Sequence, residues 1–373
     1  MARIIRLVNE HMTTEEKQRT LFVGIDVHKD THTAVGVSPF GEKLFELTVG
    51  NYQKDFDELS KRIREVGTGA VLSPFVGLED CSGYGERIAS ALYTDGFPVV
   101  HVPPILVDRL RKRQTHPEKS DSLDALGVAK VMMHDTDSLP VYSISERSTS
   151  SKFLKELSVD REYLTVERSR LRNQLHLLLH RIYNTEYATY FKDPFALKAL
   201  RHWVRVKPAC DPYLLRAMKR KANRMLELHT AIKELEGDMQ SIMEEAGYTL
   251  PTASGCGVVL AATIIGEIGD IKRFRAPASL AKYAGCAPRE QSSGKTVRYR
   301  KTKSGNRRLN CAFHRMALSQ ISPTGNNAAR AYFKKKVSEG KTKSQALVCL
   351  RRHMVTVVYM MLKHGTEYRC PQP

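Results

Sequence analysis

Two apolar runs, each followed at once by an acidic residue, most constrain how this chain can fold. The first run, residues 21–25, precedes Asp26, and the second, residues 70–78, precedes Glu79. Short runs of apolar, β-branched and aromatic residues bounded by polar turns are typical of buried strands. A chain that alternates strands and helices can gather such strand-end acids at one place. The two carboxylates are therefore candidates for a shared site.

Two further acids stand at the start of a helical stretch. Asp121 and Asp124 open the segment that runs to Met133, and residues three apart lie on the same face of a helix. Two strand-end acids and two helix acids can surround a pair of Mg²⁺ ions. Asp at a helix start is also a common N-cap, and an acid after a strand is often only a turn residue. The sequence favours the metal site because all four acids occur together.

The first part of the chain alternates strands with helices. Strands are expected at 21–26, 33–37, 43–49, 70–79 and 97–102, and helices at 55–66, 84–94, 104–113 and 120–133. Three strands, a helix and then alternating strands and helices predict a ribonuclease-H-like α/β fold over roughly residues 21–140. The segment 1–20 is charged throughout, so it is expected to be a short extension without a secretory signal.

The middle of the chain predicts long helices. Leucines recur at helical spacing among many charges between 147 and 185, and the segment 211–246 repeats this style. Its apolar positions, spaced 4, 3, 4 and 3 residues apart as in a heptad seam, are Leu228, Ile232, Leu235, Met239 and Ile242. Two such helices, joined by a segment that contains Pro194 and Pro208, predict an antiparallel hairpin or an oligomerisation arm. Helices packed on a globular core are an equally open alternative.

The net charge of +19 is unevenly placed along the chain. Residues 271–373 carry 23 Lys or Arg and 3 Asp or Glu, whereas the other 270 residues have a balance of −1. A concentrated basic block is typical of a module that binds a polyanion, most often nucleic acid. A basic tail that only aids solubility fits less well, because the block also contains apolar helix-like segments. In this third part of the chain, helices are expected at 258–265, 277–284, 306–319, 327–337 and 344–363.

The third part of the chain contains two candidate phosphate-binding segments. Gly255-Cys256-Gly257 precedes an apolar helix, and backbone N–H groups at a helix N-terminus suit a phosphate. Residues 285–296 place hydroxyls next to glycine and are followed by the cationic stretch 297–308. This segment is expected to be a loop that either contacts a nucleic-acid backbone or supplies a serine nucleophile. Its composition favours the first interpretation.

Cationic side chains near the acids and in the basic block are the expected nucleic-acid contacts. They are Arg109, Arg111, Lys112, Arg113, Lys119, Arg289, Lys295, Arg298, Arg300, Lys301, Lys303, Arg307 and Arg308. Contacts of this kind to phosphates are expected to weaken with added salt.

The cysteines and the apolar runs argue against a disulfide-rich secreted protein and against a membrane-spanning protein. The seven cysteines are scattered, odd in number and without a C-x-x-C pair, which indicates a reducing, cytoplasmic compartment and makes a structural zinc site unlikely on spacing. No run approaches the ~18 uninterrupted apolar residues of a membrane span.

Short motifs follow one another in a characteristic order between residues 21 and 365. Those in the first part of the chain are the segment 24–29, Glu79 with Tyr84 downstream, Pro103, and the segment 119–125. Those in the third part are the segments 283–288, 291–294 and 305–309. Jointly these motifs resemble those of the DEDD-type insertion-sequence transposases. That group also contains the pilin-gene inverting recombinases and the RNA-guided bridge recombinases.

The resemblance implies a domain organisation and a set of catalytic residues. It implies a RuvC-like domain at 21–145, a helical coiled-coil region at 146–248 and a basic transposase domain at 249–373. The acids implied to bind two Mg²⁺ ions, for which Mn²⁺ can substitute, are Asp26, Glu79, Asp121 and Asp124. The implied nucleophile is the serine directly before the glycine, Ser293, with the adjacent Ser292 as a close competitor. It attacks DNA and becomes transiently linked to it.

The resemblance also implies partners. They are donor and target DNA, a noncoding guide RNA, and further copies of the chain joined as a dimer or tetramer through the helical region. The implied location is the bacterial or archaeal cytoplasm, in association with the nucleoid. The chain departs from the family pattern after Glu79, where Asp80-Cys81-Ser82-Gly83 carries its glycine one place later than usual. The local turn is therefore expected to differ, and Asp80 adds a nearby carboxylate.

Three other functions fit parts of the sequence. A structure-specific nuclease of the Holliday-junction resolvase type would use the same acids with water as nucleophile. A kinase of the actin-like group shares the Gly-Ile-Asp pattern after its first strand, but no P-loop motif is visible and the basic block argues against it. A binding protein with a degenerate site is the third alternative.

Overall fold

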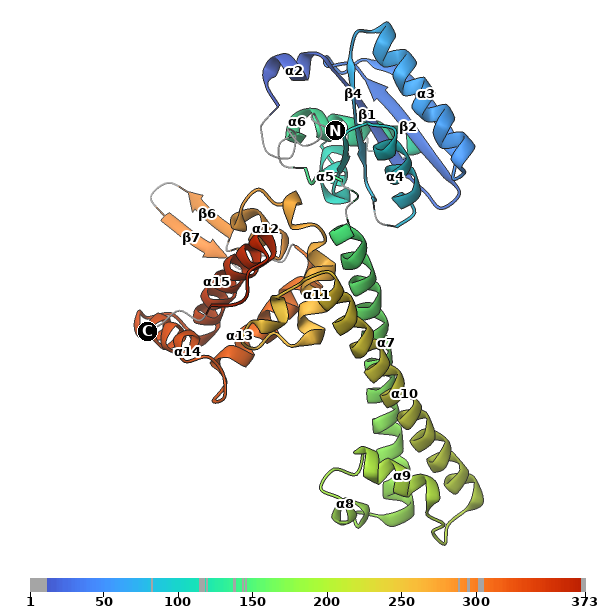
Figure 1. Cartoon of the computed structure of the whole chain (residues 1–373), viewed down its shortest axis with the longest axis vertical. Helices are drawn as coiled ribbons and strands as arrows, with labels where there is room; N and C mark the ends of the chain where they lie inside the picture. The colour runs from blue at the N-terminus through green and yellow to red at the C-terminus, as the bar shows by residue number, and fades with distance from the viewer. Residues whose placement is uncertain are drawn as a thin grey trace. The chain divides into compact units, whose positions relative to one another are not determined.

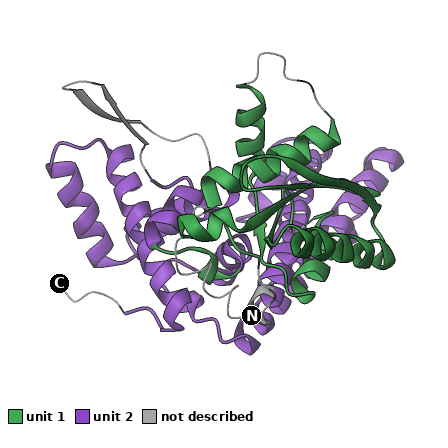
Figure 2. Ribbon diagram, turned by 90° about the horizontal axis from the view of Figure 1, so that it is seen from above, with its two compact units in different colours: residues 1–148, 270–276 green, residues 149–269, 277–373 purple. Residues whose placement is uncertain are grey.

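The computed structural model describes most of the chain. The described residues are 12–81, 83–113, 118, 120–136, 139–142, 144, 146–287, 289–293, 296–300 and 305–369, with only the backbone described for 146–148, 289–293 and 296–300. The chain forms two compact units (Figure 2). The first unit comprises Met1–Ser148 and Asp270–Ala276, and the second comprises Thr149–Gly269 and Pro277–Pro373. Figure 1 labels the helices and strands of both units.

The first unit is built on a five-stranded mixed sheet. Its strands are β1 (Thr20–Val27), β2 (Thr31–Val37), β3 (Lys43–Gly50), β4 (Ser73–Leu78) and β5 (Val99–His101). They lie in the order β3-β2-β1-β4-β5. The first three strands pair antiparallel, whereas β4 runs parallel to both β1 and β5. The five predicted strands and the mixed α/β class are confirmed.

Helices cover both faces of this sheet. They are α3 (Gln53–Gly69), α4 (Glu86–Thr94), α5 (Pro104–Arg111) and α6 (Asp121–Asp135), and the short helix α2 (Thr14–Gln18), which has no buried residue, precedes β1. One apolar cluster joins the sheet to α3 and α4 through side chains such as Phe56 and Ile88. A second cluster joins the opposite face to α5 and α6 through side chains such as Val107 and Val128. Because strand residues alternate between the faces, these two clusters give the sheet a core on each side.

Gly24 lets α6 approach the central strand very closely. A Cβ atom built on Gly24 would lie 2.2 Å from the Ala125 carbonyl oxygen and 2.4 Å from the Ala129 nitrogen. Both are backbone atoms of α6, so no side-chain movement can make room for it. The absence of a side chain at this position therefore sets the distance between β1 and α6.

His32 makes the stability of the first unit depend on pH. Its side chain is fully buried on β2 beside Phe56, with ring centroids 6.0 Å apart. Burial lowers the pKa of His32, and the neighbouring Asn51 side chain opposes this shift without reversing it. Below about pH 6.5 the His32 side chain therefore binds a proton in the unfolded chain but not in the folded chain. The free energy of unfolding falls as the pH drops through this range.

We expect His32→Phe to remove this acid sensitivity. The wild-type protein should lose up to about 1.4 kcal/mol per pH unit relative to the variant as the pH falls below the ordinary histidine range. Urea unfolding of both proteins between neutral and mildly acidic pH measures the difference. Parallel curves for the two proteins would show that His32 does not carry the effect.

The second unit contains the predicted antiparallel helical hairpin. Its long helices are α7 (Glu146–Tyr183) and α10 (Pro212–Glu245), which lie side by side (Figure 1). Arg161 on α7 pairs with Glu236 on α10 at 2.7 Å, and Glu167 pairs with Arg224 at 2.8 Å. As position rises on α7 it falls on α10, so the helices are antiparallel. The predicted apolar seam is also present, because Leu228, Ile232 and Met239 are buried and Leu235 and Ile242 are half-buried.

Two short helices close the far end of this hairpin. They are α8 (Tyr187–Tyr190) and α9 (Leu197–Arg205), in the segment that was predicted only as a connection containing Pro194 and Pro208. Trp203 of α9 is fully buried, and its indole Nε1 donates a hydrogen bond to the Pro194 carbonyl oxygen at 2.8 Å. Tyr187 and Leu200 belong to the same apolar cluster. The aromatic residues of the connection therefore form a small core of their own.

The remainder of the second unit is mainly helical, as predicted. It comprises the 3₁₀ turn η2 (Leu250–Thr252), α11 (Val258–Ile268), α12 (Pro277–Tyr283), α13 (Arg307–Ile321), α14 (Asn327–Ser338) and α15 (Lys343–His364). A second 3₁₀ turn, η3 (Ile271–Arg273), belongs to the first unit. Among the described residues, the chain has no helix with the length and apolar content of a membrane span.

One expectation for the second unit was wrong. The segment 285–296 was expected to be a loop, but it contains strand β6 (Arg289–Ser293), which pairs antiparallel with β7 (Thr296–Arg300). The β-forming residues Thr296, Val297 and Tyr299 favour this conformation. The dense charge hid the strands, because a two-stranded ribbon has no need of the apolar alternation that marks a half-buried sheet.

Candidate metal centre

Two of the predicted acids lie at the ends of neighbouring parallel strands, at the same level. Ile25 of β1 is in register with Leu78 of β4; Asp26 is the next residue of β1, and Glu79 directly follows the last residue of β4. The carboxyl ends of parallel strands meet at one edge of a sheet, so the two acids share that edge. Asp26 is 6% exposed and Glu79 is half-buried.

The other two acids lie in the first turn of α6. Ser120 caps this helix, and its hydroxyl accepts a hydrogen bond from the Leu123 N–H at 3.2 Å. Asp121 and Asp124 follow in the first turn, where the helix dipole stabilises carboxylates. The close contact of α6 with Gly24 holds this turn beside the end of β1.

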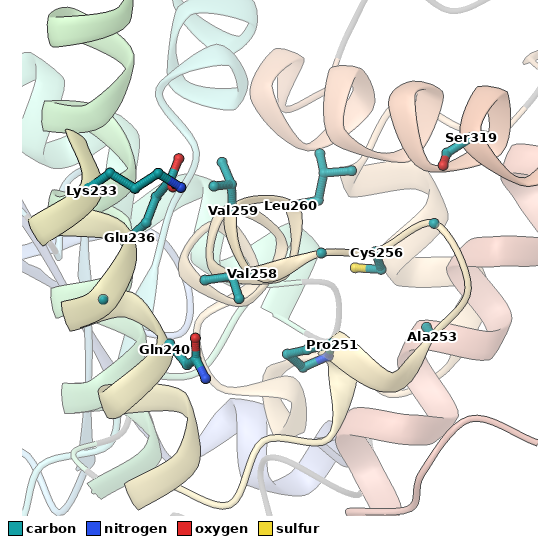
Figure 3. A pocket seen from close by; sticks show the side chains of 13 residues that line it. Lys233, Glu236, Gln240, Pro251, Ala253, Cys256, Val258, Val259, Leu260 and Ser319 are labelled. Carbon is teal, nitrogen blue, oxygen red and sulfur yellow. The ribbon is translucent and has the colours of Figure 1, made fainter. Parts of the chain in front are cut away.

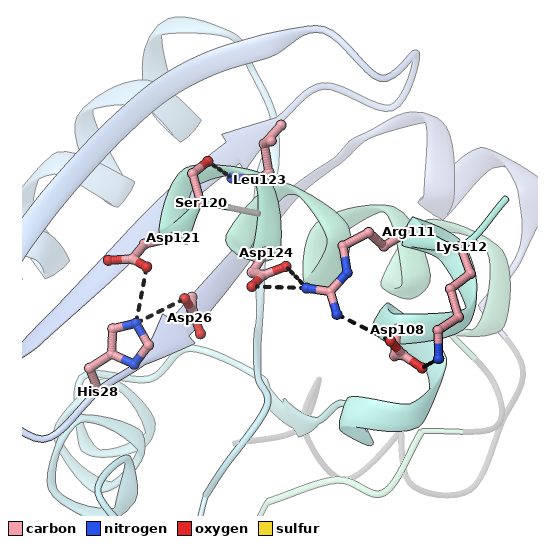
Figure 4. A network of polar contacts seen from close by, with 9 residues as sticks. All are labelled: Asp26, His28, Asp108, Arg111, Lys112, Ser120, Asp121, Leu123 and Asp124. Carbon is pink, nitrogen blue, oxygen red and sulfur yellow. Dashed lines mark hydrogen bonds and ion pairs between the residues drawn. The ribbon is translucent and has the colours of Figure 1, made fainter. Parts of the chain in front are cut away.

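His28 joins the strand acid to the helix acid. Its Nε2 atom lies 3.1 Å from an Asp121 carboxylate oxygen and 3.4 Å from Asp26 Oδ2 (Figure 4). One ligand atom from each of these three side chains lies within 4.8 Å of the others. Asp26, His28 and Asp121 are therefore spaced as the ligands of one metal ion can be.

Arg111 holds Asp124 beside this group. Its Nη1 donates to the two Asp124 carboxylate oxygens at 3.0 and 3.4 Å, and its Nη2 contacts Asp108 at 3.1 Å. Lys112 also pairs with Asp108, at 2.7 Å (Figure 4). Arg111 thus supplies a counter-charge to one of the four acids from within the first unit.

The carboxylate of Asp26 is poorly compensated. Burial raises the pKa of Asp26, and the nearby Asp124 and Asp121 carboxylates add to this rise, while His28 opposes it. Asp26 Oδ2 is buried and has no hydrogen-bond partner among the described residues. A buried oxygen without a partner costs free energy unless a cation or donor reaches it. A cluster of carboxylate oxygens is also the ligand set that hard divalent cations prefer. The residues therefore fit a divalent cation.

The sequence predicted the acids but missed one of their neighbours, His28. The structure brings Asp26 and Asp121 together, places Asp124 next to them under Arg111, and leaves Glu79 at the same sheet edge. His28 was not predicted as part of the site. Its position two residues after Asp26, where an extended chain returns to the same face, was a usable signal.

Asp80, the carboxylate next to Glu79, supports the local turn of the chain. Its Oδ1 accepts a hydrogen bond from the Gly83 N–H at 2.8 Å. A Cβ atom on Gly85 would lie 1.9 Å from the Asp80 carbonyl oxygen, so the chain turns tightly here. Asp80 is a turn residue that shapes the connection from β4 to α4.

The residues predicted to contact nucleic acid differ in exposure and in how much of them the structure describes. Arg109, Lys112 and Arg113 are exposed on and after α5, and Arg307 is exposed at the start of α13. Only the backbone is described for Arg289, Ser292, Ser293, Arg298 and Arg300, and Lys119, Lys295, Lys301 and Lys303 lie outside the described residues.

Arg308 is engaged inside the second unit. It pairs with the buried Glu267 at 3.0 Å and with Glu162 at 3.3 Å, and it donates to the Ser158 hydroxyl at 3.3 Å. These contacts tie α13 to α7 and α11. A direct contact of Arg308 with nucleic acid stays a prediction.

The predicted Gly-x-Gly turn opens α11 beside a cavity. Gly255 has a positive φ of 74°, and Gly257 is the N-cap of α11. The turn borders a cavity of about 870 Å³ that also includes Lys233, Glu236 and the first residues of α11 (Figure 3). Burial raises the pKa of the Cys256 thiol to about 12, so this cysteine stays protonated. Phosphate binding at this turn stays a prediction.

Comparisons with known proteins agree with the order of these elements. Residues 23–184 match a family model described as a transposase, that of the DEDD transposases of IS110 elements, and residues 248–334 match the model of the transposase IS116/IS110/IS902 family. The chain is 28% identical to the insertion element IS116 uncharacterized 44.8 kDa protein of Streptomyces clavuligerus, over 92% of this chain and 94% of that protein.

Two other relatives extend over similar lengths. The insertion element IS110 uncharacterized 43.6 kDa protein of Streptomyces coelicolor is 25% identical, over 95% of this chain and 96% of its own. The pilin gene-inverting protein of Moraxella bovis is 22% identical, over 93% of this chain and 97% of its own. Both parts of the chain are therefore matched, in order, by transposase models, and the chain belongs to the IS110 family of transposases and recombinases, enzymes that act on DNA.

Proposed function

We propose that this transposase cuts and rejoins DNA at a magnesium centre formed by Asp26, Glu79, Asp121 and Asp124. The observation that carries this proposal is the buried Asp26 Oδ2 beside the Asp121 carboxylate. This Asp26 oxygen accepts no hydrogen bond from a described residue and has only the 3.4 Å contact with His28 Nε2. Bound Mg²⁺, of which we propose two ions with Mn²⁺ as a substitute, would polarise the scissile phosphate and stabilise the leaving oxygen. The sheet order supports a RuvC-like fold for this unit, because it continues three antiparallel strands with two parallel ones.

The side chains around the acids have distinct proposed tasks. Asp26 and Glu79 hold the cation from the strand ends, and Asp121 and Asp124 hold it from α6. In the absence of a cation, His28 bridges Asp26 and Asp121 and limits their repulsion. Arg111 keeps Asp124 oriented through two contacts of its guanidinium nitrogen. Exposed cations on α5 then orient the DNA backbone through salt-sensitive contacts.

We propose Ser293 as the nucleophile. Its hydroxyl oxygen would form a bond to phosphorus while the bond from phosphorus to a deoxyribose oxygen breaks, and that oxygen takes up a proton. The serine ester keeps the phosphodiester energy, so strands can be rejoined without ATP. Ser293 is the last residue of β6 and is in register with Thr296, the first residue of β7. A two-stranded β-ribbon is one of the elements that a DNA major groove admits.

We propose two further partners. A noncoding guide RNA would select the donor and target DNA by base pairing, as the resemblance to bridge recombinases implies. A second copy of the chain would bind along α7, where Tyr163 and Leu177 leave 70% and 53% of their side-chain surface exposed. Exposed apolar groups of this size favour a protein partner when they gather on one helix face.

The test is cleavage of a suicide DNA substrate carrying the ends of the mobile element, with the co-purified RNA present. We expect cleavage only with Mg²⁺ or Mn²⁺, and a covalent protein–DNA adduct that survives denaturation. Chelation by EDTA should abolish both. Metal-dependent cleavage without any adduct would instead support the nuclease alternative, in which water attacks the phosphate. No cleavage under any metal would contradict the proposal altogether.

A further inference from the structure

The far end of the helical hairpin carries a second concentration of positive charge. Residues 168–224 contain 14 Lys or Arg and only 3 Asp or Glu, a balance of +11. The net charge of residues 1–270 is close to zero because the acidic residues outside 168–224 offset this positive charge. The net charge of the whole part therefore does not reveal the basic segment. The segment is far in sequence from the basic block at 271–373.

Helix α9 concentrates this charge on one face. Lys198, Arg201, His202 and Arg205 are all exposed, and their spacing of 3, 4 and 7 residues from Lys198 places them on one side of the helix. At 1.5 Å per residue the row is about 10 Å long. The opposite side is anchored in the core by the fully buried Trp203. The cationic face is therefore held by a rigid scaffold.

The cations of this face form no ion pair with the part of the chain that the structure describes. Among the described residues, Lys198, Arg201 and Arg205 form no ion pair, and α9 contains no acidic residue. Other exposed cations of the hairpin end that form no ion pair with a described residue are Arg170, Arg181, Lys192, Lys207 and Arg220. Arg172 and Arg224, by contrast, pair with Asp193 and Glu167.

A structural role does not explain this arrangement. Surface cations that only keep a helix soluble are usually balanced by acids at neighbouring positions. Helix α3 of the first unit is an example, because it carries four Lys or Arg and four Asp or Glu. On α9 the positive charges of Lys198, Arg201 and Arg205 repel one another, and the helix has no acidic residue to offset this repulsion. An external polyanion removes that repulsion.

We propose that the α9 face, defined as Lys198, Arg201, His202 and Arg205, binds the phosphate backbone of double-helical DNA. The argument is charge complementarity: duplex DNA carries one negative charge per about 1.7 Å of its axis, so several phosphates fall within the length of the row. The contacts are to backbone only, so binding is independent of sequence. The hairpin then holds DNA through residues distinct from both the acids and the basic block. The proposal rests on the family's action on DNA but on neither the metal nor the serine.

The test is DNA binding by the full chain in EDTA, where cleavage chemistry cannot contribute. The variant carries Lys198→Glu, Arg201→Glu and Arg205→Glu, and the probe is a fluorescent duplex of arbitrary sequence. We expect affinity at moderate salt to fall at least about tenfold, and the slope of log K against log salt to flatten by about 3. The matched control carries Lys54→Glu, Lys61→Glu and Arg62→Glu on α3, which are equally exposed, and it should bind within about twofold of wild type.

A charge-preserving variant separates electrostatics from folding. Lys198→Arg, Arg201→Lys and Arg205→Lys together should keep the wild-type affinity and salt slope, whereas a general defect of α9 would weaken this variant too. Unchanged duplex binding by the charge-reversed variant overturns the proposal. A structured RNA of matched length is the second probe: loss of RNA binding with intact duplex binding would assign the face to RNA and overturn the proposal as well.

Discussion

Asp26→Asn is expected to abolish DNA cleavage and yet to stabilise the metal-free protein. The activity should fall about 100-fold or more, because the variant loses a charged ligand at the proposed metal centre. The stability should rise because the folded protein raises the pKa of Asp26, chiefly by burial. A raised pKa means that the ionised carboxylate is less favourable in the folded chain than in the unfolded chain. Stability is therefore lost as pH rises above the ordinary Asp value of about 3.9, and asparagine removes this loss at neutral pH.

Thermal melting with and without Mg²⁺ measures both effects. In EDTA the variant should melt at a higher temperature than the wild-type protein. Added Mg²⁺ should raise the melting temperature of the wild type but not of the variant, because only the wild type has the full ligand set. Asp80→Asn is the matched control, since Asp80 is a nearby carboxylate that supports a turn. It should keep the wild-type response to Mg²⁺. An Asp26→Asn protein that still cleaves DNA and still responds to Mg²⁺ would remove Asp26 from the site.

Ser293→Ala is expected to abolish the covalent protein–DNA adduct. Loss of a nucleophile typically costs about 1,000-fold or more in rate. The measurement is the yield of adduct on a suicide DNA substrate after denaturation. Metal binding, followed by the Mg²⁺-induced rise in melting temperature, should be unchanged, because the acids belong to the other unit.

The matched control for this experiment is the neighbouring residue. Ser292 directly precedes Ser293 in β6 and offers the same hydroxyl group. Ser292→Ala should keep the adduct. The reverse result would make Ser292 the nucleophile. Undiminished cleavage by both variants would favour attack by water.

Much of the first unit could be predicted because its signals are local. Apolar runs and helical spacing gave the five strands and the helices around them, and the position of Asp26 after a buried strand gave its place at a sheet edge. The contact of Arg111 with Asp124 could not be predicted in the same way. It depends on how α5 packs against α6, and Arg111 stood in the sequence only as one cation among several.

Several elements of the second unit could not be predicted from charge or hydropathy taken over long segments. The charge of β6 and β7 concealed these strands, and α9 was missed because it lies in the connection between two long helices. The charge of residues 168–224 was hidden because it was summed with more acidic neighbours. A narrower window would have revealed it. The side that α9 turns to solvent, however, follows from the burial of Trp203, which requires the tertiary structure.

The contact at Gly24 has a consequence for how the site tolerates sequence change. The distance between the proposed ligands on β1 and those on α6 is set by backbone against backbone at this contact. A single methyl group added at position 24 would push α6 away from β1 and separate Asp26 from Asp121 and Asp124, although all of these acids would still be present.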